Sequence, residues 1–404
     1  MSLVRELPVY SPLSVGALGS GLRALAGGGA GARARVEDLI RRDYAPSGLL
    51  LTDSGTSALA LALLGVAAKS QQQSPVALPA YCCYDIATAA DTAGLPVLLY
   101  DLDPLTLGPD WASLDRTLAR GARAVVVAHL FGVPVDLDRT RLACRNSGAV
   151  LVEDAAQGPG GRWRDRRLGV TGSLGILSFG RGKGVTGGGG GALLANDAAG
   201  LEYMARVEER IGPRARGLAS WLSSAAQWAL ARRSVYGLPA SLPFLGLGET
   251  RYRHPTPPSG MRAACAGILA RSWALAKKEN QARRERAARL CARLEARTEL
   301  RVPTVPAGGE AGFLRLPVVM GDRAAKEVSG LRDLGVMPGY PRALCDLPGF
   351  AERTIQTGEE FPGARSLARS LFTLPSHSRL SEAALTRIET WIERWAKAGA
   401  SVVI

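Results

Sequence analysis

The chain has 404 residues, of which 47% are hydrophobic and 21% are charged, and its formal net charge is +14. This composition excludes a fibrous or disordered protein, and the length allows an extensive core in two or three domains. Because the arginines are scattered and alternate with acids, as in Arg283-Arg284-Glu285-Arg286, we expect no nucleic-acid binding. The positive charge suits an anionic substrate or membrane surface instead.

Seven short apolar runs predict the strands of a sheet, and helical patterns separate several of them. We expect strands at 49–52, 76–79, 97–102, 124–130, 149–153, 175–179 and 192–195, and helices at 57–66, 85–93, 110–120 and 138–147. Nearly continuous apolar strands that alternate with helices indicate a sheet buried on both faces. We therefore predict an α/β fold, with a large domain built on a mostly parallel seven-stranded sheet flanked by helices.

Residues 214–250 form an apolar insertion in this large domain. The stretches 217–231 and 234–248 are uncharged, and Arg232-Arg233 lies between them. Leu218, Trp221, Leu222, Ala225 and Ala229 share one helical face. The favoured interpretation is an amphipathic helix packed on the core or on a partner subunit. The alternative is a peripheral membrane contact through 214–248, since neither half is long enough to span a bilayer.

The C-terminal part of the chain changes character. A long helical pattern covers 261–296, a strand-like run follows at 311–319, and a final helical pattern covers 381–398. We predict a large domain over residues 1–280 and a smaller C-terminal α/β domain over residues 281–404.

The cysteines and histidines favour no metal site. The six cysteines, at 82, 83, 144, 265, 291 and 345, show no CxxC spacing, and the chain has three histidines. The opening residues lack the apolar segment of a signal peptide. We expect reduced thiols and a cytoplasmic location.

Polar clusters follow four of the predicted strands. They are Ser54-Gly55-Thr56-Ser57, residues 81–84, Asp154-Ala155-Ala156-Gln157, and the loop from Ser178 to Lys183. Ligands of parallel sheets collect beyond the carboxyl ends of the strands. The four clusters therefore predict one active site.

Lys183 is the candidate catalytic residue. The chain has six lysines and forty-four arginines, and only a lysine can lose its proton and act as a nucleophile. A strand-end acid, Asp154, together with a lysine in a Ser/Gly-rich loop suggests pyridoxal phosphate held as a Schiff base. The freed amine would then carry the proton from the substrate carbon.

The other candidates would bind the cofactor. Asp154 would pair with the protonated ring nitrogen, and Gln157 with the ring hydroxyl. The helix N-terminus at Gly55, with the Thr56 and Ser57 hydroxyls and Ser178, would bind the phosphate. Simpler interpretations stay open, because Ser or Thr at a helix start is usually an N-cap and a strand-end acid is often structural.

The ordered motifs resemble those of the DegT-type (sugar) aminotransferases, which have the aspartate-aminotransferase fold (fold type I of the pyridoxal phosphate enzymes). The matching segments are Ser54-Gly55-Thr56-Ser57-Ala58-Leu59, Leu78-Pro79-Ala80-Tyr81, Gly94-Leu95-Pro96-Val97, Asp101-Leu102-Asp103-Pro104, His129-Leu130-Phe131-Gly132-Val133-Pro134, Val152-Glu153-Asp154-Ala155-Ala156-Gln157, Ser178-Phe179 through Lys183, Gly189-Gly190-Gly191, Gly335-Val336, Tyr340-Pro341, Phe361-Pro362-Gly363-Ala364 and Leu374-Pro375-Ser376-His377.

The resemblance implies roles, a partner and a reaction. Lys183 would be the Schiff-base lysine, Asp154 the pyridinium partner, Gln157 the ring-hydroxyl contact, and Thr56, Ser57 and Ser178 the phosphate ligands. It further implies a homodimer with the active site between subunits. The implied reaction moves an amino group, usually from glutamate, to a keto sugar linked to a nucleotide, for polysaccharide or secondary-metabolite biosynthesis.

Three departures concern the substrate and subunit contacts. Cys83 stands where relatives stack an aromatic ring on the cofactor. Either Tyr84, the main candidate, or Tyr81 would supply that ring, or Cys83 would pack there as a small apolar residue. Residues 254–261 lack the asparagine that contacts the partner's phosphate, and Cys345 replaces a frequent histidine. Two alternatives therefore stay open: another reaction of the same cofactor, such as dehydration, and a non-catalytic scaffold or sensor in a glycan pathway. A lysine at position 183 argues against the relatives that carry histidine there and act as dehydratases.

Overall fold

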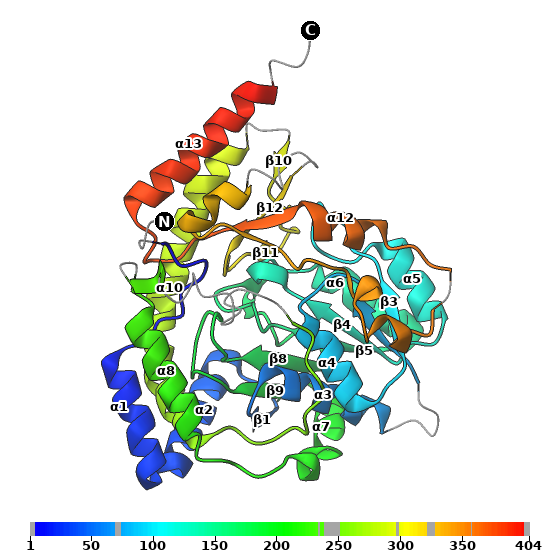
Figure 1. Cartoon of the computed structure of the whole chain (residues 1–404). Helices are drawn as coiled ribbons and strands as arrows, with labels where there is room; N and C mark the ends of the chain where they lie inside the picture. The colour runs from blue at the N-terminus through cyan, green and yellow to red at the C-terminus, as the bar shows by residue number, and fades with distance from the viewer. Residues whose placement is uncertain are drawn as a thin grey trace.

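A seven-stranded sheet forms the centre of the computed structural model, which describes residues 5–68, 74–232, 235–237, 251–295, 299–320, 328–356 and 358–399 (Figure 1). Its strand order is β1-β9-β8-β5-β4-β2-β3, and β9 is antiparallel to both of its neighbours. The pairs from β8 to β3 are all parallel. The strands are β1 Gly48–Thr52, β2 Val76–Pro79, β3 Val97–Tyr100, β4 Ala124–Ala128, β5 Val150–Asp154, β8 Leu174–Ser178 and β9 Gly191–Ala195. The predicted mostly parallel seven-stranded sheet is confirmed.

Helices cover both faces of this sheet, because its strands carry apolar residues on both faces. Along β4, Ala124 and Val126 face one hydrophobic core while Val125 and Val127 face the other. The first core is closed by α3 Gly55–Ala67, α4 Tyr84–Ala93, α7 Ala198–Ala205 and α12 Pro362–Ser370. The second is closed by α2 Gly29–Tyr44, α5 Trp111–Ala119, α6 Leu137–Ser147 and the first half of α10 Ala263–Leu294.

A smaller antiparallel sheet belongs to the C-terminal part of the chain. Its order is β10-β12-β14-β13, formed by β10 Leu300–Arg301, β12 Leu316–Met320, β14 Leu371–Leu374 and β13 Met337–Pro338. A third core lies between this sheet, the end of α10 and α13 Glu382–Gly399. The helix α10 runs through residue 280 without a break, and it contributes Leu269 to one core and Leu290 to the other. The domain boundary at 280 stays a prediction.

Short elements complete the chain. They are α1 Val15–Arg23, the π-helix Ala24–Gly28, α8 Leu218–Leu230, the 3-10 helices Leu130–Gly132, Glu208–Arg210, Ser329–Leu334, Leu344–Asp346 and Ala351–Arg353, and a three-stranded sheet of β11 Gly309–Glu310, β6 Arg162–Trp163 and β7 Arg166–Arg167.

Residues 6–11, here called the N-terminal strap, contact the C-terminal part of the chain, the helix α10 and the loop that carries Lys183. The backbone N–H of Glu6 donates to Asp333 O at 2.8 Å, and His377 Nε2 lies 2.7 Å from Leu7 O. At the other end of the strap, Tyr10 O accepts from the fully buried Arg283 of α10 at 2.6 Å. The strap therefore joins segments that lie more than 250 residues away from it along the chain.

The described part of the apolar insertion contains α8, while residues 233–234 and 238–250 lie outside the described residues. The helix packs on α1 and α10, and Trp221 Nε1 donates to Leu18 O at 2.9 Å. Its buried side is centred on Trp221 and Ser224, so the expected common face is split: Leu218 and Leu222 point to solvent. The hydrogen bond from Trp221 to α1 fixes the rotation of α8, so Leu218 and Leu222 cannot face the same side as Trp221.

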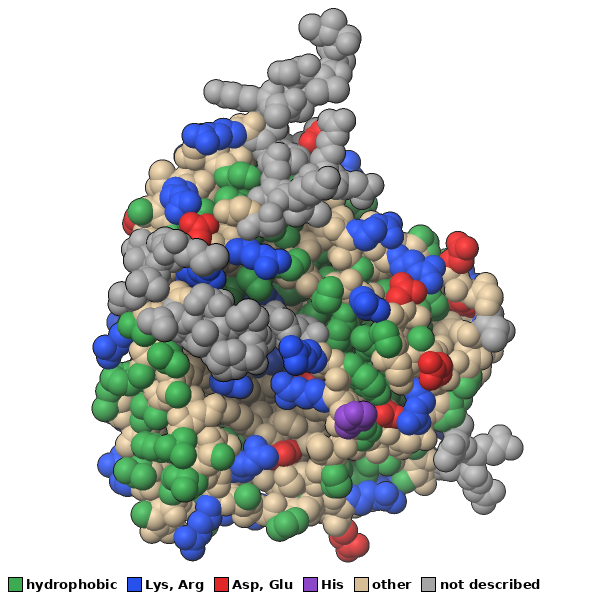
Figure 2. Space-filling view, in the orientation of Figure 1, with side chains coloured by type: hydrophobic (Ala, Val, Ile, Leu, Met, Phe, Trp, Pro, Cys, Tyr) green, Lys and Arg blue, Asp and Glu red, His purple; other side chains and the backbone are tan. Residues whose placement is uncertain are grey.

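Exposed apolar side chains gather where α1 and α8 meet. We call Val15, Leu22, Leu218, Leu222 and Leu230 the apolar patch; they are five of the ten large exposed hydrophobic residues in the described part of the chain. Hydrophobic side chains gather at the lower left of Figure 2, where Figure 1 places α1 and α8. Within the described ranges, no helix combines the length and apolar character needed to cross a membrane.

The close approach of α3 to α7 yields a stability prediction. A Cβ at Gly65 would lie 2.4 Å from Tyr203 O, whereas a Cβ at Gly19 of α1 would meet nothing within 4 Å. We expect Gly65→Ala to lower the free energy of unfolding by about 1–3 kcal/mol through overpacking. The matched control, Gly19→Ala, should be neutral or raise it by up to about 1 kcal/mol. Urea denaturation measures both, and equal stabilities of the two variants would contradict the packing argument.

Candidate active site

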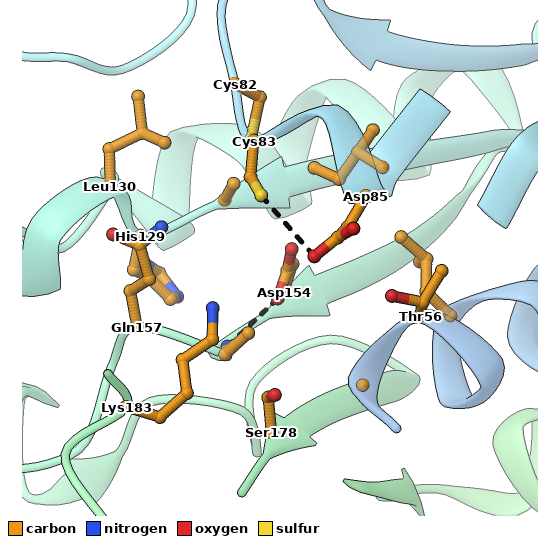
Figure 3. Close-up of a pocket in the computed structure, with 15 residues that line it drawn as sticks. Thr56, Cys82, Cys83, Asp85, His129, Leu130, Asp154, Gln157, Ser178 and Lys183 are labelled. Atoms are coloured by element: carbon orange, nitrogen blue, oxygen red, sulfur yellow. Dashed lines mark hydrogen bonds between the residues drawn. The ribbon is translucent and has the colours of Figure 1, made fainter. Parts of the chain in front are cut away.

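A cavity lies at the carboxyl ends of β4, β5 and β8, beside the N-termini of α3 and α4 (Figure 3). Because these three strands are parallel and adjacent, their last residues come together at one edge of the sheet. Six of the eight predicted site residues line this cavity: Gly55, Thr56, Asp154, Gln157, Ser178 and Lys183.

Ser57 and Tyr84 do not line the cavity, because their hydroxyl groups are used elsewhere. Ser57 Oγ donates to Asp53 Oδ1 at 2.6 Å, and its backbone N–H is capped by Ser54 Oγ at 3.1 Å. The phenol of Tyr84 accepts from the backbone N–H of Arg342 at 3.0 Å. Cys82, Cys83, Asp85 and Ile86 line the cavity on this side, so the ring expected from Tyr84 is not on the cavity wall.

Asp154 ends β5 as a carboxylate with few partners. In the described chain, one hydrogen bond reaches it, from the Ala156 N–H to Oδ1 at 2.9 Å. Burial raises the pKa of Asp154, against the opposing effects of the Ala156 N–H and the Lys183 charge. A cationic ring nitrogen would stabilise the ionised form, because an opposite charge at short range favours it.

The opposite wall combines a helix N-terminus with two hydroxyl groups. Thr56 lies in the first turn of α3, and Ser178 ends β8. A Cβ at Gly55 would lie 2.8 Å from Ser178 Cβ, so glycine is required for α3 to start this close to β8. Free backbone N–H groups and hydroxyls at a helix start form a cradle that suits a phosphate.

The loop between β8 and β9 carries Lys183 into the cavity (Figure 3). Gly188 and Gly190 have φ of 73° and 105°, values at which a residue with a side chain would be strained. The lysine's own backbone is fixed from outside the sheet, because Ser11 Oγ of the N-terminal strap donates to Lys183 O at 2.6 Å. In the described chain, neither the Lys183 amine nor the Thr56 and Ser178 hydroxyls have a recorded hydrogen-bond partner. These three groups and Asp154 fit the amine-reactive, anionic and cationic parts of pyridoxal phosphate.

Gln157 is held by two hydrogen bonds behind the cavity surface. Its Oε1 accepts from the Phe131 N–H at 2.8 Å, and its Nε2 donates to the Tyr340 phenol at 2.6 Å. One N–H of the amide remains available for a ring hydroxyl. The amide is therefore fixed in orientation by a residue from the C-terminal part of the chain.

A fully buried acid, Glu153, lies one residue before Asp154. It accepts hydrogen bonds from Gly169, Thr171 and Gly172 N–H and lies 2.9 Å from His129 Nε2. His129 Nδ1 accepts from the Val135 N–H, which assigns the ring proton to Nε2. Burial acts to raise the pKa of Glu153, but the His129 and backbone hydrogen bonds outweigh it and hold the pKa below its ordinary value.

Sequence reasoning missed several residues at the cavity. Asp85 lines it from the first turn of α4, and the strand-end argument that selected residues 81–84 would have reached it one position further on. Ser11 had no signal, because it contacts Lys183 across 172 residues of chain. The roles of all these residues toward a cofactor stay predictions.

Comparison with known proteins gives a family match over most of the chain. The model of the DegT/DnrJ/EryC1/StrS aminotransferase family matches residues 47–393. Among curated proteins, the L-glutamine:2-deoxy-scyllo-inosose aminotransferase of Micromonospora echinospora is 38% identical over 153 residues, 37% of this chain and 35% of that protein. The chain thus matches about a third of that relative's length.

Solved structures share the fold over nearly the whole chain. The sugar aminotransferase CalS13 from Micromonospora echinospora has a TM-score of 0.75 at 21% identity, covering 96% of this chain and 98% of CalS13. The GDP-4-keto-6-deoxy-D-mannose-3-dehydratase of E. coli, solved with hydrated pyridoxal phosphate, has a TM-score of 0.74 at 15% identity, covering 96% and 99%. At these identities the likeness establishes the fold.

The buried acid under the cavity yields a pH prediction. Because the folded-state pKa of Glu153 is lowered, its charge stabilises the fold above the unfolded pKa of about 4.3, and this contribution is lost as the pH falls through the folded value. We expect Glu153→Gln to lower the free energy of unfolding by about 1–3 kcal/mol at pH 7, with a smaller difference below pH 4. Denaturation at both pH values measures this. Glu393→Gln, which breaks a surface ion pair with Arg293, is the control; a pH-independent loss in Glu153→Gln would contradict the assignment.

Proposed function

Because this chain belongs to the DegT/DnrJ/EryC1/StrS aminotransferase family, we propose that it moves an amino group from an amino acid to a keto sugar, with pyridoxal phosphate as cofactor. The observation that carries the proposal is the cavity into which Lys183 and Asp154 both point (Figure 3). Around them, Thr56 and Ser178 offer hydroxyls that no described residue occupies. The chain thus presents an amine, a carboxylate and a phosphate cradle in one site.

The chain's own groups would hold the cofactor at three points. When bound, pyridoxal phosphate supplies a carbonyl that accepts amino groups and a ring that withdraws electrons from the reacting carbon. Asp154 Oδ2 would pair with the ring nitrogen, and burial makes that pairing strong because little water screens it. The N-terminus of α3, with Thr56 and Ser178, would bind the phosphate, while the remaining Gln157 N–H would orient the ring hydroxyl.

Lys183 would act twice through one atom. Its Nζ would hold the cofactor covalently in the resting protein, and once displaced by the amino donor it would be a free amine within the cavity. That amine would then take the proton from the substrate carbon that bears nitrogen and deliver it to the former carbonyl carbon of the cofactor, on the other side of that nitrogen. Ser11 supports both roles by fixing the Lys183 backbone, so the amine returns to the same place after displacement.

The substrate class follows from the relatives by analogy. The matched Micromonospora echinospora protein uses glutamine as donor and 2-deoxy-scyllo-inosose as acceptor, by its name, and CalS13 is named a sugar aminotransferase. We propose an acceptor with a ketone on a polyhydroxylated ring and a donor of the glutamate or glutamine type. A nucleotide link on the acceptor, and a place in polysaccharide or secondary-metabolite biosynthesis, are the finer parts of this proposal.

Replacement of Lys183 tests the proposed function directly. Wild-type protein with pyridoxal phosphate should absorb visible light and lose that absorbance when glutamate or glutamine is added. Lys183→Ala should lose at least 1000-fold in amino transfer, since no other described side chain in the cavity can replace the amine. Absorbance and product assays with a keto nucleotide sugar and a free ketocyclitol measure the reaction and separate the two acceptor types.

The matched control is Lys278→Ala, which removes an exposed lysine from α10. It should keep the wild-type absorbance and rate. Wild-type protein that binds no cofactor would refute the proposal and favour the scaffold alternative. Protein that keeps its absorbance with amino donors but removes water from a keto sugar would favour dehydration.

We further propose that the chain forms a homodimer and that a second copy covers the apolar patch. Contiguous exposed apolar side chains on soluble proteins mark interaction sites. The patch lies on two helices that pack on each other and on α10, so its side chains are held in fixed positions. A rigid apolar surface of this kind suits a self-complementary contact with the same surface of another copy.

The double variant Leu218→Asp/Leu222→Asp tests the dimer. We expect light scattering to give a dimer for wild type and a dimer weakened at least 100-fold for the variant, because charges replace two of the exposed leucines of the patch. Leu142→Asp, at an exposed leucine on α6, is the control and should stay dimeric. A monomeric wild type that sediments with anionic vesicles would contradict the proposal and favour the membrane contact through 214–248.

We also propose a cytoplasmic location. All six cysteines are free in the structure, and each of them lies in a hydrophobic core or packs against one. Reduced, unpaired thiols are typical of proteins in reducing compartments.

A further inference from the structure

Behind Gln157 lies a group of hydrogen-bond donors that lack acceptors. We call Arg315, Tyr81 and Tyr340 the donor cluster. Arg315 directly precedes β12, and its guanidinium carbon lies 5.4 Å from the centre of the Phe131 ring. The Arg315 Nε is buried and has no hydrogen-bond partner. Within the described ranges, no carboxylate forms an ion pair with this arginine.

Both phenols of the donor cluster are used as acceptors. The Tyr81 oxygen accepts from the Tyr340 N–H at 2.8 Å, and the Tyr340 oxygen accepts from Gln157 Nε2 at 2.6 Å. Burial raises the pKa of both tyrosines, so each phenol keeps its proton. Neither O–H has a recorded acceptor among the described residues, which adds two more donors to those of the guanidinium.

Arg315 is half-buried, and no opposite charge near it compensates for the burial of its Nε. The groups that act on it most strongly are Tyr340, Tyr81 and Cys83, all neutral at pH 7, and burial raises the pKa of the Cys83 thiol to about 12. Burial lowers the pKa of Arg315 itself. Its stacking on Phe131 offsets only part of the cost, because a buried cation normally needs a partner that accepts hydrogen bonds.

The donor cluster borders the cavity. Gln157 lines the cavity and contacts Tyr340, whose ring stacks on Phe131 with centroids 5.8 Å apart. Phe131 has a φ of 57°, a strained conformation for a bulky residue, and its N–H is held by Gln157. The backbone of Phe131 is thus constrained. The ring of this residue faces Arg315, and its N–H donates to Gln157 in the cavity wall.

We propose that Arg315, Tyr81 and Tyr340 bind the carboxylate of the amino donor, an inference that rests on the proposed function of the same cavity. A guanidinium offers two parallel N–H groups that match the two oxygens of a planar carboxylate. The phenol O–H groups of Tyr81 and Tyr340 can donate hydrogen bonds to the remaining lone pairs of the carboxylate oxygens. A single positive charge also balances a single carboxylate, whereas a diphosphate carries more negative charge than this cluster compensates.

A carboxylate of the donor and a diphosphate of a nucleotide-linked acceptor would both present oxyanions to the donor cluster, so the experiment distinguishes these two ligands. Glutarate is the carboxylate probe, because it lacks an amino group and binds without any transfer. Pyrophosphate is the probe for a nucleotide-linked acceptor. Calorimetric titration of each probe into the cofactor-loaded protein gives its dissociation constant independently of catalysis.

Three variants define the expected result. Arg315→Gln should weaken glutarate binding 10- to 100-fold, and Arg315→Lys should weaken it less, because the charge remains without the bidentate geometry. Tyr340→Phe should weaken it about 3- to 10-fold without any change in charge. Arg342→Gln, at an exposed arginine two residues from Tyr340, is the matched control and should leave glutarate binding within 2-fold of wild type.

Kinetics with the same variants tie the site to the donor. Arg315→Gln should raise the donor concentration that half-saturates the loss of cofactor absorbance, again 10- to 100-fold, and leave the KM of the acceptor within 2-fold. Unchanged glutarate binding in both Arg315→Gln and Tyr340→Phe, or an effect confined to pyrophosphate and the acceptor KM, would overturn the inference. Glutarate binding that depends on Arg315 in a protein without amino transfer would support the carboxylate site while refuting the proposed function.

Discussion

The register of three parallel strands determines where every polar group of the cavity lies. Ala128 of β4 pairs with Asp154 of β5, and Asp154 pairs with Ile176 of β8. The strand β8 ends at Ser178, two residues after Ile176. A shift of one residue would turn Asp154 away from the cavity and bring Glu153 into it. The apolar residues on both faces of these strands prevent such a shift, because it would exchange the contacts of the two hydrophobic cores.

Two neighbouring acids on β5 have different environments because their side chains point to opposite faces of the sheet. Glu153 points to one side and is satisfied by three backbone N–H groups and His129. Asp154 points to the other and has a single N–H donor. The same contrast separates Ser57, whose hydroxyl is bonded to Asp53, from Thr56, which faces the cavity. Groups that lack partners in the chain therefore identify where a ligand is needed.

Much of this arrangement could be predicted from the sequence, because short-range patterns carry it. Apolar runs located all seven strands of the large sheet, and strand-end polar residues located six residues of the cavity wall. The structure does not place Ser57 and Tyr84 on that wall, because the Ser57 hydroxyl bonds to Asp53 and the Tyr84 phenol turns toward Arg342, which the sequence does not reveal. Their roles toward a cofactor stay predictions. Arg315 and Ser11 escaped prediction because their partners are distant in the chain and no local pattern connects them.

The N-terminal strap has a consequence for the order of assembly. Glu6 and Leu7 are synthesised long before Asp333 and His377, which they contact. The strap therefore gains these contacts only after the strands of the large sheet, residues 48–195, have been made. Because Ser11 of the same strap contacts the Lys183 backbone, docking of the C-terminal part on the strap is coupled to the position of the lysine loop.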